Sequence, residues 1–479
     1  MFESVRRAHA TEPLNGTAMT LATDLAKRIL ETRYADLPPE AIHWAKVGLL
    51  DTIGCMIAGS RDKSTQIVTR VTTGTSGPSL LFGQDRRVAA LDAAQINGTA
   101  AHALDLDDCS NTLGGHPSAA VLPALFALAD EIGATGEQFI AAYVIGFETE
   151  CKLSLCLNFH QYTKGWHPTV TIGIFGGTAA ACYLAGLSEE KTAIALAMAA
   201  SMAAGVKSNF GTDTKPLHVG NCARSALFAT VLARAGFTAS PGAFEHKQGY
   251  LNVFNGEGNY DVSKIFPHWG APWDIVKPGI AIKQYTCCGS THPVVDAMLD
   301  LTNEHDLKPE MVARIQTWTH PRRLEHTNRP DPKSDVDARF SVQYVSSRAL
   351  ADRRILPEHF ENNAYREPRI QSILKRVESS TYTTEQFPAD NHFAAEVRIT
   401  LTDGRMLSKK LDQPYGRTSA NPLPAERMKA KFDGCVRGII HDANIAPLYD
   451  TIQAFETLAD VRAVTALISS SPVRSAVAA

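Results

Sequence analysis

The sequence has no C-x-x-C pair, although nine cysteines occur among its 479 residues. The thiols stand singly, except for the neighbours Cys287 and Cys288, so neither a zinc ribbon nor a redox dithiol is expected. An odd number of cysteines without a disulfide-like spacing is typical of proteins in a reducing compartment. The cysteine pattern therefore predicts a cytoplasmic protein.

Long apolar runs and an excess of charge are also missing. No uninterrupted run reaches the roughly 18 apolar residues that indicate a membrane-spanning helix. The first residues, Met1 to Gly16, are polar and of mixed charge, without the apolar segment of a signal peptide. The net charge of −3 offers no basic surface to phosphates. We therefore expect neither a membrane nor nucleic acid as a partner.

Three motifs of common enzyme classes are absent from the chain. There is no Gly-rich phosphate loop, no G-x-S-x-G elbow and no H-E-x-x-H pair. Their absence weighs against nucleotide-dependent enzymes, acyl hydrolases and zinc proteases. Candidate functional residues are therefore sought in shorter groups of polar side chains.

Helical periodicity dominates the first half of the chain. A length of 479 residues exceeds one ordinary hydrophobic core and predicts at least two domains. Up to Ala235 nearly every segment has apolar residues at helical spacing, and only the stretch from Ile67 to Arg87 looks irregular. The predicted helices are Met19–Arg33, a segment opened by Pro38-Pro39, Val88–Ala103, Ser118–Ile132, Gly136–Leu155, Thr169–Ala185, Ser188–Ala204 and Pro216–Ala235.

Strand patterns begin after Pro272 to Pro278. Apolar and polar residues alternate in Ile315–His320 and more regularly in Glu396–Thr402, from which Asp403-Gly404 supplies a turn into Arg405–Leu411. Helical patterns flank these strands, in Pro293–His305, Val345–Ala351 and Ile370–Val377.

The predicted fold is therefore mostly α. It comprises a large all-helical domain built from both chain ends, residues 17–278 and 416–470, and a smaller α+β lid domain, residues 279–415. The tail from Pro424 to Ile468 returns to helical periodicity, so we expect it to dock on the first domain.

A loop between two helix-compatible segments gathers the densest group of polar side chains. It runs from Ala101 to Pro117 and carries His102, Asp105, Asp107, Asp108 and His116. Three like charges within four residues cost free energy when they are desolvated, which suggests a cation, a metal or a working role. The alternative is a solvated helix junction, with an Asp as N-cap and Pro117 at the first helical position.

Four further patches place a polar residue beside a proline, a glycine or an element boundary. They are Lys164–Pro168 with His167, Asn209–His218 with Lys215, Gly279–Pro293 with Lys283 and His292, and Arg339–Tyr344 with its tyrosine. Each has a structural alternative: a satisfied core histidine, a surface lysine, buried thiols at Cys287-Cys288, and a half-buried tyrosine. Lys215 precedes Pro216, which favours a helix start, and free N–H groups beside a lysine make an anion site.

Together these side chains suit a small polyanion and proton transfer beside a carboxylate. Removing a proton next to a carboxylate builds negative charge on that carboxylate, and lysine ammonium groups stabilise the charge where water is excluded. A histidine tuned near neutrality acts as base or acid.

Five motifs in this order resemble the MmgE/PrpD family, which includes 2-methylcitrate dehydratase, cis-aconitate decarboxylase and iminodisuccinate epimerase. They are AHALDLDD…GGHPSAAVLP, GWHPT, NFGTDTKPLHVG, IAIKQYTCCGSTHP and FSVQY. The resemblance covers the chain from about Ala22 to Ile468. It implies a helical domain made from both chain ends, a lid domain between them, a homodimer, and neither a metal nor an organic cofactor.

Carried over motif by motif, the resemblance implies six catalytic residues: Asp105, His116, His167, Lys215, Lys283 and Tyr344. The expected substrate-binding set is His102, Asp108, Cys109, Lys215, His218, Lys283 and His292. The threonine that is common after the Asp-Asp pair in the family is Cys109 here. The gap from Asp108 to His116 is also longer than in the decarboxylase and looks more like that of the epimerase.

We expect a cofactor-free lyase of the dehydratase or decarboxylase type that acts on a small di- or tricarboxylate. An epimerase on the same fold is the alternative. A Mg²⁺-dependent prenyl-diphosphate enzyme is a remote alternative, because Asp107-Asp108-Cys109-Ser110-Asn111 faintly resembles a DDxx[DN] metal loop, although no second such motif follows. A catalytically silent binding protein is a further class, since fold alone does not fix function.

Overall fold

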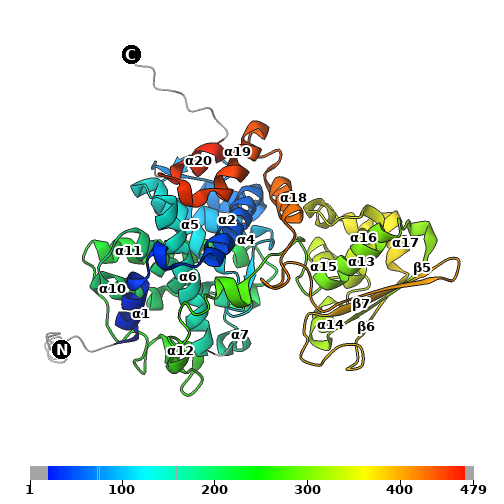
Figure 1. Ribbon diagram of the computed structural model, residues 1–479, viewed down its shortest axis with the longest axis horizontal. Helices are drawn as coiled ribbons and strands as arrows, with labels where there is room; N and C mark the ends of the chain where they lie inside the picture. Colours follow the sequence, from blue (N-terminus) through cyan, green and yellow to red (C-terminus); the bar gives the residue numbers. More distant parts are fainter. Residues whose placement is uncertain (1–19, 73, 75, 158, 470–479) are drawn as a thin grey trace, which may run out of the picture.

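The computed structural model describes residues 20–72, 74, 76–157 and 159–469, and within these ranges the protein is mostly helical. Figure 1 shows two lobes: a large helical body that holds both ends of the described chain, and a smaller body in which helices lie beside a sheet. The predicted mostly α fold, with a large helical domain and a smaller α+β domain, is confirmed.

The central helices of the large domain are apolar on nearly all sides, as expected for interior helices. They are α2 (Pro39–Gly59), α4 (Ala90–Ala103), α5 (Pro117–Ile132), α6 (Gly136–Leu157) and α11 (Thr214–Arg234). Helices α4 and α11 pack closely, since a Cβ at Gly98 would lie 3.0 Å from the Cα of Gly220. This packing fixes two segments of the site: α4 leads into the acidic loop, and α11 begins at Thr214.

Shorter helices complete the domain, and one of them, α9 (Gly173–Leu184), also lies in its centre, since Gly173 to Cys182 are all buried. They are α1 (Leu21–Glu31), α3 (Lys63–Thr72), α7 (His160–Lys164), α8 (Pro168–Thr171), α9 (Gly173–Leu184), α10 (Glu189–Met202) and α12 (Tyr250–Asn255). Helix α2 is long and apolar enough to cross a bilayer, but 67% of its most apolar window is buried within the protein. That burial is typical of a core helix.

The small domain is built on a four-stranded sheet with its own hydrophobic core. The strands are β5 (Val312–Thr319), β6 (Val377–Thr381), β7 (Ala395–Leu401) and β8 (Met406–Leu411), in the order β6-β5-β7-β8. Only the β5–β6 pair is parallel. Its helices are α13 (His292–Glu304), α14 (Pro321–Thr327), α15 (Asp335–Arg339), α16 (Val342–Asp352) and α17 (Pro368–Leu374).

The end of the described chain returns to the large domain, as the sequence predicts. Helices α18 (Ala425–Val436), α19 (Asp442–Gln453) and α20 (Arg462–Ile468) cover one side of it (Figure 1). Phe432 and Ile452 belong to the same hydrophobic core as Leu49 and Ile53 of α2. The proposed domain boundaries stay a prediction, and residues 17–19 and 470 lie outside the described ranges.

Several local predictions were wrong. The stretch Ile67–Arg87 is not irregular throughout, because it contains most of α3 and a short pairing of β1 (Ser79–Leu80) with β2 (Arg87–Val88). The predicted helix Thr169–Ala185 is divided at Ile172, and the one predicted over Ile370–Val377 ends at Leu374. Two-residue strands carry too little periodicity to be recognised in a sequence.

Candidate active site between the two domains

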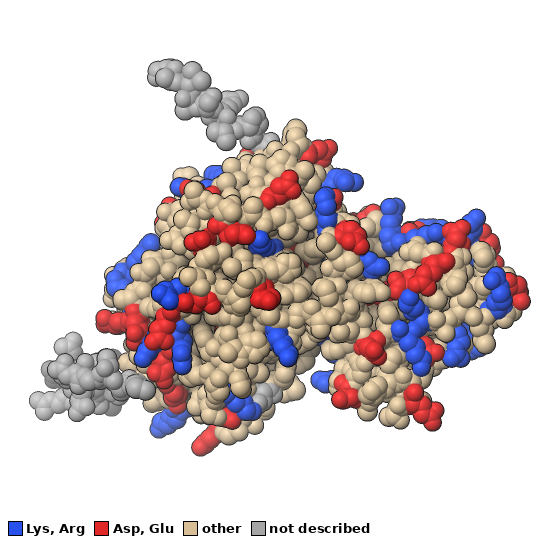
Figure 2. All heavy atoms as spheres, in the orientation of Figure 1, with Lys and Arg blue, Asp and Glu red and all other residues tan. Residues whose placement is uncertain are grey.

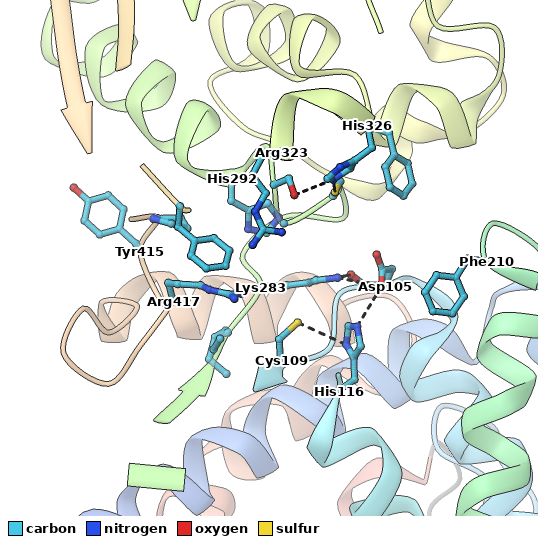
Figure 3. A pocket seen from close by; sticks show the side chains of 18 of the residues that line it. Asp105, Cys109, His116, Phe210, Lys283, His292, Arg323, His326, Tyr415 and Arg417 are labelled. Atoms are coloured by element: carbon cyan, nitrogen blue, oxygen red, sulfur yellow. Dashed lines mark hydrogen bonds and ion pairs between the residues drawn. The ribbon is translucent and has the colours of Figure 1, made fainter. Parts of the chain in front are cut away.

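A cavity of about 450 Å³ lies where the two domains meet. The large domain contributes Asp105, Cys109, His116 and Lys215 to its wall, and the small domain contributes Arg323 and His326. Figure 3 shows Asp105, Cys109, His116, Arg323 and His326 facing a common space, with Lys283 extending across it. A second cavity of about 260 Å³, which also touches Asp105 and Lys215, reaches His102 and Arg339.

A short strand pair brings distant parts of the sequence together at this cavity. Strand β3 (Cys109–Ser110) pairs antiparallel with β4 (Ile280–Ala281), so that Cys109 lies opposite Ala281. Two residues beyond Ala281, Lys283 reaches back to the loop that precedes β3. The pairing thus places this lysine on Asp105, 178 residues away along the chain.

Two ammonium groups converge on the single carboxylate of Asp105. The Nζ atoms of Lys215 and Lys283 lie 2.8 Å and 3.0 Å from its Oδ1, and Lys283 also donates to its backbone carbonyl at 2.9 Å. Burial would raise the pKa of Asp105, but the two lysines outweigh it and hold the pKa well below its usual range. Asp105 has a φ of 53°, a left-handed conformation that is strained for a residue with a side chain and is common at functional sites.

The carboxylate of Asp107 is shared by two imidazoles. Its oxygens lie 2.8 Å from Nδ1 of His102 and 3.1 Å from Nδ1 of His116. Burial lowers the pKa of His102 to about 4, so this ring is neutral at pH 7 and donates its Nδ1–H to Asp107. For His116, burial is outweighed by the charges of Asp107 and Cys109, which raise the pKa to about 10. His116 is therefore an imidazolium on the cavity wall at neutral pH.

The thiol of Cys109 completes this corner of the cavity. Its Sγ lies 3.8 Å from Nδ1 of His116, as the dashed line in Figure 3 marks. Burial would raise the pKa of Cys109, but His116, Lys283 and Arg417 lower it to about 7. The thiol is thus substantially ionised near neutral pH, which a threonine at this position would not be.

Local packing fixes the position of His116. Pro117 starts α5, and the backbone N–H of His116 donates to Oγ1 of Thr169 at 3.1 Å. A Cβ at Gly115 would come within 2.7 Å of that same oxygen, so the chain can pass Thr169 only with glycine at this position.

Of the other three predicted histidines, one lines the cavity and two lie behind its wall. His292 lines the cavity. Burial, and after it the nearby charge of Lys283, lower the pKa of His292 to about 3. His167 and His218 are buried behind the wall, with their Nδ1 atoms 3.3 Å apart, and the ring of His167 contacts those of His102 and Phe210. Burial lowers the pKa of both. Among the described residues, then, neither lines either cavity, and each supports the wall from behind.

Two predicted site residues are placed elsewhere. Asp108 is buried below the loop, where it accepts hydrogen bonds from the backbone and hydroxyl of Ser118. Tyr344 lies in the core of the small domain and donates its hydroxyl hydrogen to the carbonyl of His359. Neither lines either cavity, and the substrate contact predicted for Asp108 and the catalytic role predicted for Tyr344 stay predictions. Both side chains bury a polar atom that needs a partner inside the protein.

Four donors could in principle hold a metal: His102, Asp105, Asp107 and His116 lie within 4.8 Å of one another. Their chemistry fits a cation poorly, because two ammonium groups already contact Asp105 and the pKa of His116 favours its protonated form. The set therefore suits an anion better. The DDxx[DN] resemblance does not form a Mg²⁺ loop either, since Asp108 is bound to Ser118 and Asn111 accepts a hydrogen bond from Arg417.

The sequence interpretation missed two cavity arginines and the role of Asp107. Arg417 follows Gly416, and Arg323 lies two residues after Pro321, so both stand beside a backbone breaker as the predicted patches do. The same criterion would have selected them. Asp107 was recognised as part of the acidic loop, but its sequence position does not reveal that two imidazoles converge on it.

The fold and the site define a helical, two-domain protein with a cationic cavity between the domains. The MmgE/PrpD N-terminal domain matches residues 23–263, and the MmgE/PrpD C-terminal domain matches residues 285–450. The chain belongs to the MmgE/PrpD family.

Three relatives carry the name cis-aconitate decarboxylase. The human protein is 29% identical over 467 residues, covering 94% of each chain. The mouse protein is 28% identical over 455 residues, covering 90% of each chain, and that of Aspergillus terreus is 26% identical over 503 residues, covering 99% of this chain and 98% of its own.

Proposed function

We propose that this protein is a lyase that acts on a small di- or tricarboxylate, with cis-aconitate as the first substrate to test. One observation carries the proposal: two lysines converge on one carboxylate, Asp105, in a cavity that also contains the imidazolium of His116. In this arrangement the ammonium groups would hold a carboxylate of the substrate, and His116 would present a proton beside it. The names of the relatives support the choice of first substrate.

The proposed chemistry for an unsaturated tricarboxylate is a decarboxylation. The bond between carbon and the departing carboxylate breaks, and CO₂ leaves while the electron pair stays behind. That pair is delocalised through the double bond into a neighbouring carboxylate, where Lys215 and Lys283 stabilise the added negative charge. His116 then gives the proton on its Nε2 atom to the substrate carbon that carries the delocalised electron pair. Nε2 is the ring nitrogen that faces away from Asp107. These residues supply the charge and the proton without a cofactor.

An epimerase remains the second candidate, and Cys109 favours it. Epimerisation requires one group that removes a proton from carbon and another that returns it. The thiolate of Cys109, with a pKa of about 7, would be the base, and the imidazolium of His116, which also lines the cavity, would be the acid that returns a proton to the opposite face of the carbon. In this reaction the carbon skeleton stays intact.

NMR in D₂O with cis-aconitate, 2-methylcitrate and iminodisuccinate tests both candidates. A lyase gives new skeletons or alkene signals, whereas an epimerase exchanges a substrate proton for deuterium and retains the skeleton. Lys215→Ala should lower kcat/KM by about 100-fold or more, since a charge that stabilises the transition state is removed. Full activity in this variant would refute the role given to the lysines.

We also propose a homodimer in the cytoplasm. Apolar side chains exposed on the large domain, among them Phe237 and Val253, favour a partner surface, and all nine cysteines are free thiols. Light scattering should give twice the 51.8 kDa mass of the chain, and a monomer at micromolar concentration would contradict the dimer. Cell fractionation tests the location.

A further inference from the structure

Two arginines flank one phenyl ring on the wall of the cavity. The guanidinium carbon of Arg417 lies 3.8 Å from the ring centroid of Phe393, and that of Arg323 lies 4.3 Å from it. Figure 3 shows the two arginine side chains, which come from different segments, pointing into the same space. Stacking on a shared ring restricts the positions of both guanidinium groups.

Neither guanidinium group has a carboxylate partner among the residues that the structure describes. Arg323 donates its Nε–H to the carbonyl of His392 at 3.3 Å, and Arg417 donates from Nη2 to the side-chain oxygen of Asn111. The Nε atom of Arg417 is buried without any acceptor. A buried cationic donor that lacks an acceptor costs free energy, and an anion in the cavity would remove that cost.

The arginines differ in this respect from the lysines across the cavity. Lys215 and Lys283 share the carboxylate of Asp105, whereas no carboxylate among the described residues pairs with Arg417 or Arg323. Burial, opposed by the nearby Cys109 and aided by the charge of Arg323, lowers the pKa of Arg417 to about 10, and burial also lowers the pKa of Arg323. A bound anion would favour the charged form of both. The cavity thus presents one pair of cations that a single protein carboxylate neutralises only in part, and a second pair that contacts no carboxylate.

We propose that Arg417 and Arg323 form a second carboxylate subsite, which binds the substrate carboxylate that takes no part in the reaction. A planar guanidinium group binds a carboxylate through two parallel hydrogen bonds, which fixes its orientation as well as its position. The subsite restricts the substrate to acids with at least two carboxylates, one at the lysines and one at the arginines. This assignment rests on the proposed function for the reacting end of the ligand, and on the uncompensated arginines for the other end.

Calorimetric titration with propane-1,2,3-tricarboxylate, a saturated acid with no double bond to react, tests the subsite directly. Arg417→Met and Arg323→Met should each weaken its binding by about 10- to 100-fold, the effect of losing hydrogen bonds to a charged group. Arg322→Met is the matched control, since Arg322 is exposed, precedes Arg323 and does not line the cavity, and its affinity should equal that of the wild type. Butyrate, with one carboxylate, should bind the wild type more weakly than the tricarboxylate does, because it can occupy only one of the two subsites.

Equal affinity of the tricarboxylate for the wild type and both arginine variants, or no measurable binding to the wild type, would overturn the subsite. Unchanged melting temperatures exclude misfolding as the cause of a loss, and Arg417→Lys should bind with intermediate affinity, because it keeps the charge but loses the paired geometry. With a turned-over substrate, KM should rise more than kcat falls. If no acid is turned over but Arg417→Met still weakens tricarboxylate binding, the proposed function fails and the subsite stands.

Discussion

At the scale of single residues, the carboxylate of Asp107 contacts two histidines whose pKa values are shifted in opposite directions. Asp107 contacts both rings, yet burial dominates at His102 and the nearby negative charges dominate at His116. The first ring is neutral and orients Asp107, and the second is a cation on the cavity wall. Separating pKa values in this way is how neighbouring groups are given different roles in proton transfer.

The raised pKa of His116 predicts the alkaline limb of the pH profile. In the proposed reaction the protonated ring is the proton donor, so kcat/KM should stay high through neutral pH and fall as the pH rises through about 10. Asp107→Asn removes the charge that raises this pKa, so the limb should move down toward the ordinary value near 6.5. His116→Asn should lower kcat by about 100-fold or more. An alkaline limb that does not move in Asp107→Asn would contradict the assignment of His116 as the acid.

Cys109 should react as a thiolate at lower pH than an ordinary cysteine. Its pKa of about 7 predicts that alkylation by iodoacetamide rises with pH around a midpoint near 7 instead of 9. Peptide mass spectrometry identifies the site, and Cys109→Ser should lose this fast phase. Cys288, which also lines the cavity, has a raised pKa and serves as an internal comparison. Lys283→Met should move the midpoint upward, because this lysine favours the thiolate.

At the scale of secondary-structure elements, the acidic loop is held from both ends of the chain. Lys431 of α18 donates to the carbonyl of Leu106 at 2.8 Å and forms an ion pair with Asp51 of α2. The side chains of the pair are 4% and 0% exposed, which separates this pair from the surface ion pairs of the molecule. The C-terminal helices therefore stabilise the loop that carries Asp105 and Asp107.

Lys431→Met should destabilise the protein by about 3–5 kcal/mol, because it leaves the buried carboxylate of Asp51 without its partner. Activity should fall as well, since the loop loses an anchor. Lys429→Met on the same helix is the control: its ion pair with Asp433 is much more accessible to solvent than the Lys431 pair and should contribute only about 0–1 kcal/mol. Thermal unfolding followed by circular dichroism measures both. Equal losses in the two variants would show that burial of the Lys431 pair is unimportant.

The sequence could predict the elements better than the contacts between them. Long periodic segments such as Gly136–Leu155 were recognised because the apolar face repeats over many turns, and α6 occupies Gly136–Leu157. The motif residues Lys215 and Lys283 were selected, and the structure brings both to Asp105. The position of Tyr344, whose hydroxyl bonds to His359 in the core of the small domain, could not be predicted, because a motif does not say which way a helix turns its side chains. The β3–β4 pairing could not be predicted either, because two residues on each strand are too few to show periodicity.

At the scale of the whole molecule, two hydrophobic cores meet at a cavity that neither could form alone. Leu49 and Phe432 belong to one core, and Val345 and Val397 belong to the other. On the face seen in Figure 2, positive and negative side chains are interspersed, and neither sign forms a continuous patch. The uncompensated cations therefore stand out because they lie inside, where the low dielectric strengthens their attraction for an anion.

A ligand that bridges the cavity should couple the unfolding of the two domains. Propane-1,2,3-tricarboxylate at about 100 times its Kd should stabilise the bound form by about 2.7 kcal/mol, and because Lys215 and Arg323 come from different domains, it should do so only while both domains are folded. Scanning calorimetry should show the transitions of the two cores moving together to higher temperature. Lys215→Ala and Arg323→Met should each reduce this shift in transition temperature, because the two residues line the cavity from different domains. A ligand that raises the transition of one core and leaves the other unchanged would mean that it contacts a single domain, and the shared cavity would then not be its binding site.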